Sequence, residues 1–105
     1  MLELFFVDRA ATAPPETPDG LQHAGSLGYD DHRALSLIWS ECEQAGLRLS
    51  YFEDSLLSVG QIERMLAIFD ARIGQPGSDH PAFAQVRALL TRAVDSGCGL
   101  VTYCD

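Results

Sequence analysis

The chain of 105 residues contains no lysine and no apolar run close to the ~18–20 residues that cross a bilayer. Its seven basic residues, all arginine, stand against fifteen acidic ones, so the net charge is −8 at neutral pH. A surface of this sign repels nucleic acid and anionic lipid, and we expect neither to be a partner. Two interpretations of the charge stay open. It either complements a basic protein partner or only keeps the chain soluble.

Motifs that bind nucleotides or metals are also missing. The stretch Gly25-Ser26-Leu27-Gly28 is too short for a phosphate-binding loop, and neither Cys-x-x-Cys nor His-x-x-x-His occurs. The three histidines are scattered along the chain. A metal site would need the fold to bring His23 and His32 beside Asp30 and Asp31. We therefore expect no cofactor and no bound metal.

Cysteine is scarce, with three residues, and an odd count suits a reducing compartment. The first residues, Met1-Leu2-Glu3-Leu4, lack the basic region of a secretory signal, so we expect the chain to stay in the cytoplasm. Cys98 and Cys104 fall on a segment predicted to be extended, about 20 Å apart, which is too far for a disulfide. Cys42 falls among apolar residues and is predicted to be a small core residue.

The periodicity of the apolar residues predicts the element order β-α-β-α-α-β in one domain, residues 1–105. The predicted strands are 2–7, 47–52 and 99–104, and the predicted helices are 30–45, 59–73 and 81–96. Residues 9–28, with three prolines between positions 13 and 20, are predicted to form a long loop. The expected fold is α/β (or α+β): a small three-stranded sheet, first strand central, covered by three helices. The first β-α-β unit favours parallel strands joined by a right-handed crossover.

Two of the predicted helices carry clear start signals. Ser58 and Gln61 have the spacing of a capping box, and Pro81 suits the first turn of the last helix. Asp30 and Asp31 open the first helix, where carboxylates cap free N–H groups and favour the positive end of the dipole.

Carboxylates are the richest class of candidate functional groups. Asp30-Asp31 opens a helix, Glu53-Asp54 follows the predicted second strand, and Asp8 follows the first. If these strands are parallel, Asp8 and Glu53-Asp54 lie at the same sheet edge, where α/β sheets place ligand sites. Three interpretations stay open: a hydrolytic or Mg²⁺ site, a negative patch that complements a basic partner, or solvated caps and edge residues without a binding role.

Two aromatic residues bear on this choice. Tyr29 lies directly before the Asp30-Asp31 pair, and an aromatic ring beside acids suits an interface hot spot. Trp39 falls on the apolar stripe of the first helix and is predicted to belong to the core. The predicted set contains no catalytic residue. Its partner-binding residues are Tyr29, Asp30, Asp31, Glu53 and Asp54.

The closing stretch Ala93-Val-Asp-Ser-Gly-Cys-Gly-Leu-Val-Thr-Tyr-Cys-Asp105 runs helix, glycine, strand and aspartate. With the short acidic chain and the absence of a catalytic motif, this resembles the small bacterial immunity proteins that neutralise contact-delivered toxins. The resemblance implies a non-enzymatic inhibitor, monomeric or homodimeric, that masks a basic toxin with its acidic face. The alternatives are a small metal-dependent hydrolase that uses the same carboxylates and a homodimeric accessory domain.

Overall fold

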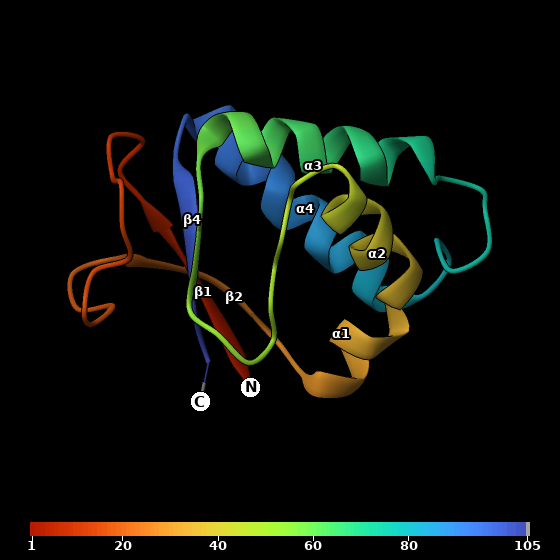
Figure 1. Ribbon diagram of the computed structural model, residues 1–105, viewed down its shortest axis with the longest axis horizontal. Helices are drawn as coiled ribbons and strands as arrows, with labels where there is room; N and C mark the ends of the chain where they lie inside the picture. Colours follow the sequence, from red (N-terminus) through yellow and green to blue (C-terminus); the bar gives the residue numbers. More distant parts are fainter. Residues whose placement is uncertain (105) are drawn as a thin grey trace.

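Four strands form one antiparallel sheet in the computed structural model, which describes residues 1–104 (Figure 1). The strands are β1 (Leu2–Val7), β2 (Gln22–Leu27), β3 (Ser55–Leu57) and β4 (Gly99–Cys104), in the spatial order β2-β1-β4-β3. The closing strand is as predicted, whereas Asp105, the last residue of the closing stretch, lies outside the described residues.

Four helices accompany the sheet and lie on one side of it (Figure 1). They are α1 (Tyr29–Ala34), α2 (Ser36–Gln44), α3 (Val59–Ala71) and α4 (Pro81–Ser96). The mixed α/β architecture and the interior place of β1 are confirmed, but the sheet has four strands rather than three. Within the described residues, no helix has the length and apolar character that a membrane span requires.

Strand β2 lies inside the segment predicted to be a long loop, residues 9–28, so that prediction is wrong in its second half. Gln22–Leu27 has few residues that favour strands, and only Ala24 and Leu27 are buried. It is a strand because β1 supplies a partner along its length. Gly25 has a packing role, since a Cβ there would lie 3.1 Å from a methyl carbon of Leu89 on α4.

Residues 47–52, predicted to be the second strand, form no ladder. Their alternation is nevertheless real, because Leu47 and Leu49 are buried while Arg48 is exposed. The backbone is held by other partners: the Leu49 carbonyl oxygen lies 3.4 Å from the Nε2 atom of His32. The pairing strand on this side of the sheet is instead β3, a few residues later.

The predicted parallel arrangement is also wrong, because every neighbouring pair of strands is antiparallel. Strands β1 and β3 both pair with β4 and therefore run in the same direction. Asp8 follows the end of β1, whereas Glu53 and Asp54 precede the start of β3. These acids consequently lie at opposite ends of the sheet, and the expected joint cluster does not form.

The predicted helix 30–45 is two helices with a break at Leu35. In a continuous helix, the carbonyl of His32 would accept the N–H of Ser36. Here it accepts the N–H of Leu35 at 3.2 Å and the indole N–H of Trp39 at 2.8 Å. The stripe predicted to face the core is buried as expected: Leu35, Ile38, Trp39 and Cys42.

The start signals of α3 and α4 are confirmed. The Ser58 hydroxyl accepts the N–H of Gln61, while the Gln61 side chain accepts the N–H of Ser58. Pro81 opens α4, and the Nδ1 atom of His80 accepts the N–H of Ala82. These two helices bury their apolar faces against the inner face of the sheet and against each other.

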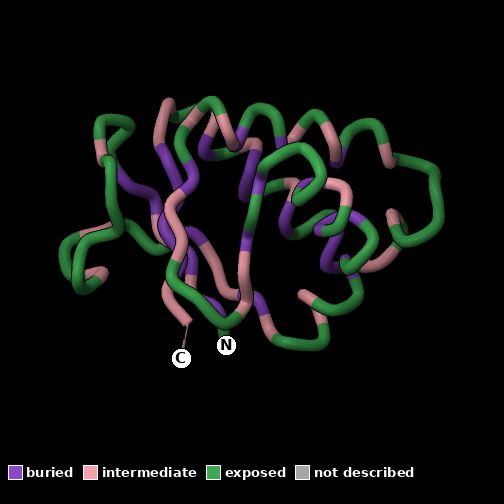
Figure 2. Tube along the Cα trace, viewed as in Figure 1, coloured by how far each residue is buried: buried purple, intermediate pink, exposed green. Residues whose placement is uncertain are grey.

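In the described part of the chain, no helix lies on the other face of the sheet. The segment between β1 and β2 lies on that side (Figure 1) and is exposed along most of its length (Figure 2). It is tied back where the hydroxyl of Tyr103 donates to the carbonyl of Pro15 at 2.8 Å. The Phe5 ring packs edge-on against Tyr103.

Candidate functional site

The 50–54 segment, which leads into β3, meets α1 through aromatic rings. Tyr29 lies 5.4 Å from Tyr51 and 6.0 Å from Phe52 between ring centroids, and Tyr51 and Phe52 lie 5.3 Å apart. Phe52 is 72% exposed and Tyr29 is 49% exposed. Two large rings thus stand in solvent, held in place by their neighbours.

A groove of about 330 Å³ lies between these rings and α2. Its walls come from α1, α2 and the 50–54 segment: Tyr29, His32, Arg33, Ser36, Trp39, Ser40, Glu43 and Phe52. The groove is open to solvent, and it combines aromatic surface with one carboxylate, one guanidinium and three hydroxyl groups, those of Tyr29, Ser36 and Ser40. This is the chemistry of a binding surface that has both apolar and polar contacts to offer.

Of the predicted partner-binding residues, Tyr29 lines this groove, whereas Asp30, Asp31, Glu53 and Asp54 do not. Asp30 and Asp31 lie in the first turn of α1, but neither caps it, because the cap position is Gly28 without a side-chain bond. Glu53 is exposed and lies 3.9 Å from Arg48 between side-chain atoms. Asp54 has a structural bond as well, since its Oδ1 atom accepts the N–H of Cys104 at 3.0 Å.

Seven of the eight residues that line the groove were absent from the predicted set, Phe52 and Glu43 among them. The signal for Phe52 was present in the sequence. Alternation from Leu47 puts Tyr51 inward and Phe52 outward with Arg48, and a phenylalanine on a solvent face is a candidate contact residue. Glu43 carries no such signal, because its role depends on where the 50–54 segment lies.

His32 and Trp39 also line the groove, and the His32 ring contacts that of Tyr51. The rings of His32 and Trp39 stack with centroids 5.2 Å apart, and the indole N–H is bonded to the His32 carbonyl. Burial lowers the pKa of His32 below its usual value, and the nearby carbonyl of Leu49 only partly offsets this. The neutral imidazole is therefore the form that the folded chain favours.

This lowered pKa predicts a loss of stability in mild acid. The ordinary value is 6.5, so the unfolded chain binds the proton first as the pH falls. We expect the free energy of unfolding to decrease as the pH falls through 6.5 and toward the lower pKa of the folded imidazole, and this decrease to be smaller in His32→Gln. Urea unfolding at a series of pH values measures both slopes. Equal slopes in the two proteins would contradict the assignment.

The described carboxylates and thiols do not assemble into a metal site. Among residues 1–104, no group of three or more His, Cys, Asp or Glu side chains is arranged to hold an ion. Cys42 is buried as predicted, and burial raises the pKa of its thiol to about 11, with the Glu41 carboxylate adding to the effect. That thiol stays protonated at neutral pH.

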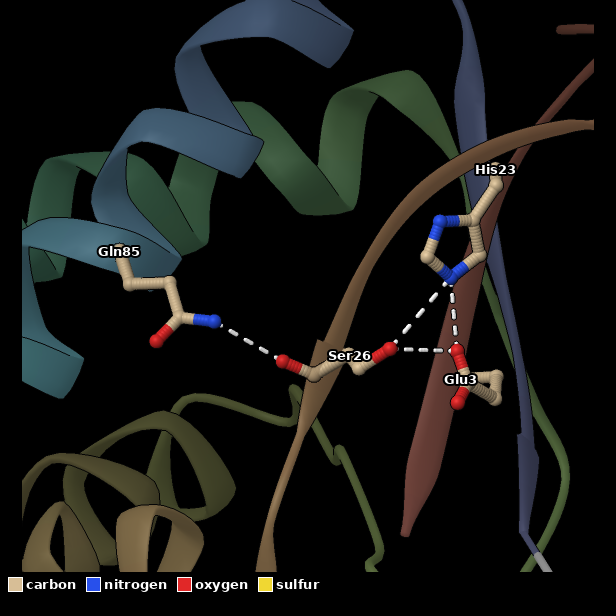
Figure 3. A network of polar contacts seen from close by, with 4 residues as sticks. All are labelled: Glu3, His23, Ser26 and Gln85. Carbon is tan, nitrogen blue, oxygen red and sulfur yellow. Dashed lines mark hydrogen bonds and ion pairs between the residues drawn. The ribbon is translucent and has the colours of Figure 1, made fainter.

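Apart from the groove, a polar cluster lies across β1 and β2 on the outer face of the sheet (Figure 3). The Oε2 atom of Glu3 lies 2.7 Å from the Nε2 atom of His23, and it accepts the hydroxyl of Ser26. The Gln85 side chain on α4 donates to the backbone carbonyl of Ser26 at 2.9 Å. The hydroxyl of Ser26 and then His23 lower the pKa of Glu3.

Serine, histidine and glutamate are also the residue types of a catalytic triad, but the geometry of this cluster differs from that of a triad. A carboxylate only accepts hydrogen bonds, so the His23 Nε2 atom carries the proton that it shares with Glu3. The same Nε2 atom faces the hydroxyl of Ser26 at 3.4 Å and has no lone pair to take its proton. A triad uses the two ring nitrogens for the two partners. The cluster is a cross-strand polar contact.

Comparisons with protein-family models, curated proteins and solved structures found no match for this chain. Fold and site together define a small mixed α/β protein with an antiparallel sheet, helices on one face, and a solvent-open groove bordered by exposed aromatic rings.

Proposed function

We propose that this chain is a binding protein that captures a basic protein partner. The docking surface consists of Tyr29, Asp30, Asp31, Phe52 and Glu53, together with the groove that Tyr29 and Phe52 line. The observation that carries the proposal is the exposure of Phe52, whose ring is 72% in solvent at the mouth of this groove. An exposed phenylalanine is costly to hydrate and gains most when a partner covers it.

Preorganisation supports the same proposal. Phe52 is in contact with Tyr29 and Tyr51, and Tyr51 is in turn in contact with His32. The ring is therefore held in position before a partner arrives, which reduces the entropy lost on binding. Rigid aromatic rings at the centre of an interface are its usual hot spots.

The charge around the groove sets the kind of partner. Residues 29–54 contain six carboxylates and two arginines, so a quarter of the chain carries half of its net charge of −8. A negative surface with an aromatic centre complements a basic surface, and opposite charges accelerate encounter. The resemblance to immunity proteins narrows the proposal to a basic toxin. What supports this narrower form is the acidic surface and the closing order of α4, Gly97 and β4.

The proposal predicts a specific loss in the variant Phe52→Asp. Immobilised wild-type chain is expected to retain a basic protein from a lysate of the organism that encodes it, and Phe52→Asp to lose it. Retention should fall between about 50 mM and about 500 mM salt, because surface charges are screened. Quantitative mass spectrometry of the retained proteins measures the difference.

Ile73 offers a matched control. It is a large apolar residue that is 57% exposed after the end of α3, and it does not line the groove. Ile73→Asp adds the same charge and should retain the partner. If wild type and Phe52→Asp retain the same proteins in the same amounts, the docking surface is wrongly assigned.

A further inference from the structure

The groove bordered by Tyr29 and Phe52 has the composition of a site for one cationic side chain. This inference rests on the proposed function, because the cation would belong to the basic partner. Its basis is the arrangement of three features: the aromatic faces, the carboxylate of Glu43 and the hydroxyl groups of Ser36 and Ser40.

The aromatic wall suits a cation. The rings of Tyr29 and Phe52 lie 6.0 Å apart at an angle of 47°, and both line the groove. Trp39 lines it as well, and its only hydrogen-bond donor is already bonded to the His32 carbonyl. The indole therefore has no free N–H group to offer the groove. A cation over such rings is attracted to their negative faces.

Glu43 supplies the opposite charge. Its carboxylate has no ion pair or hydrogen bond within residues 1–104, whereas Glu41, two residues earlier, binds Arg72 at 2.9 Å. Ser36, Ser40 and Glu43 recur at intervals of four and three residues on α2 and so lie along one face of the helix, toward the groove. That face presents acceptor oxygens in a row.

Arg33 also lines the groove, and it restricts the proposal. It is exposed and has no carboxylate within salt-bridge distance in the described part of the chain. A cation entering the groove meets the repulsion of Arg33 and the attraction of Glu43. The two residues therefore predict effects of opposite sign on the same ligand.

We propose that the groove receives an arginine side chain of the partner, with its guanidinium against the rings of Tyr29 and Phe52 and its N–H groups on Glu43. A guanidinium is planar and weakly hydrated, so it stacks on rings while its edge still donates hydrogen bonds. The ammonium group of lysine is a compact, strongly hydrated charge and uses a flat aromatic wall less well.

The test uses Nα-acetyl-arginine amide as the probe for the whole chain. Trp39 is the only tryptophan, so its fluorescence reports on this groove. We expect a saturable change with the arginine amide, and none at equal concentration with Nα-acetyl-citrulline amide, which has the same shape without the charge. Equal responses to the two compounds would overturn the proposal, as would tighter binding of Nα-acetyl-lysine amide.

Variants at exposed positions separate the effects of the carboxylate, the aromatic ring and the guanidinium on binding of the arginine amide. Glu43→Gln and Phe52→Leu should each weaken the arginine amide about two- to fivefold, and Arg33→Gln should strengthen it by a similar factor. Phe52→Leu keeps apolar surface and removes the ring, so unchanged affinity would show that no cation–π contact exists. Glu63→Gln on α3, outside the groove, is the matched control and should have no effect.

The two proposals fail in different ways. If the arginine amide does not bind while Phe52→Asp still releases the natural partner, the docking surface stands and the arginine anchor is wrong. If the arginine amide binds with the predicted variant effects while Phe52→Asp retains the partner, the cation site stands and the proposed function is wrong.

Discussion

Replacement of Phe69 by alanine is expected to lower the free energy of unfolding by about 3–5 kcal/mol. The side chain is fully buried, and its ring lies 5.7 Å from Trp39 and 5.2 Å from Phe83. Truncation leaves a cavity where α2, α3 and α4 meet, and these helices can close it only by shifting from their packed positions. A loss of this size is a large share of the ~5–15 kcal/mol that holds a domain folded.

The same truncation at Phe52 is the matched control. Because Phe52 is 72% exposed, Phe52→Ala should change stability by no more than about 0.5 kcal/mol. Urea unfolding followed by circular dichroism measures both variants. Phe69→Ala should also alter the fluorescence of Trp39, which loses a neighbour on the core side of the groove. A stability change as small as that of Phe52→Ala would contradict the assignment of Phe69 to the core.

The helices were predictable because their signals are local. The capping box of Ser58 and Gln61, the position of Pro81 and the left-handed Gly97 after α4 each depend on residues within one turn. Apolar stripes identified the buried faces for the same reason. The break at Leu35 was not predictable, because it depends on a bond between the Trp39 indole and the carbonyl of His32, seven residues apart.

Strand pairing could not be predicted from the sequence, because it depends on residues that are far apart along the chain. The segment Gln22–Leu27 is polar and contains a glycine, so by itself it has no preference for a strand. Conversely, the alternation of Leu47 and Leu49 is that of a half-buried strand, and the chain satisfies it with an extended segment outside the sheet. Periodicity reports which side chains are buried and leaves the hydrogen-bond partner undecided.

The composition of the groove was predicted only in small part. Tyr29 is the one predicted contact residue that lines the groove, and the acidic character of residues 29–54 was visible in the sequence. Asp54 accepts a hydrogen bond from the backbone of β4, and no local sequence pattern predicts this bond. Glu43 enters the groove only because the 50–54 segment packs beside α2, a contact that requires the tertiary fold.

Gly99→Ala is expected to destabilise the fold by about 1–3 kcal/mol, because the added methyl group has no room. Gly99 opens β4, and a Cβ there would lie 2.8 Å from the carbonyl oxygen of Leu57 and 3.2 Å from a methyl carbon of Val7. The first neighbour is backbone in β3 and cannot rotate away. The φ of Gly99 is not in the left-handed region, so the cost is steric.

Gly60→Ala is the control, and its expected change in stability has the opposite sign. Gly60 lies in the first turn of α3, is exposed, and has nothing within 4 Å of the position of an added Cβ. Alanine there should stabilise the chain by about 0.4–1 kcal/mol, since it restricts the unfolded state without a clash. Urea midpoints that move in the same direction for both variants would contradict the close approach of β3 and β4. Because β3 begins directly after Asp54, that close approach also fixes one end of the segment that presents Phe52.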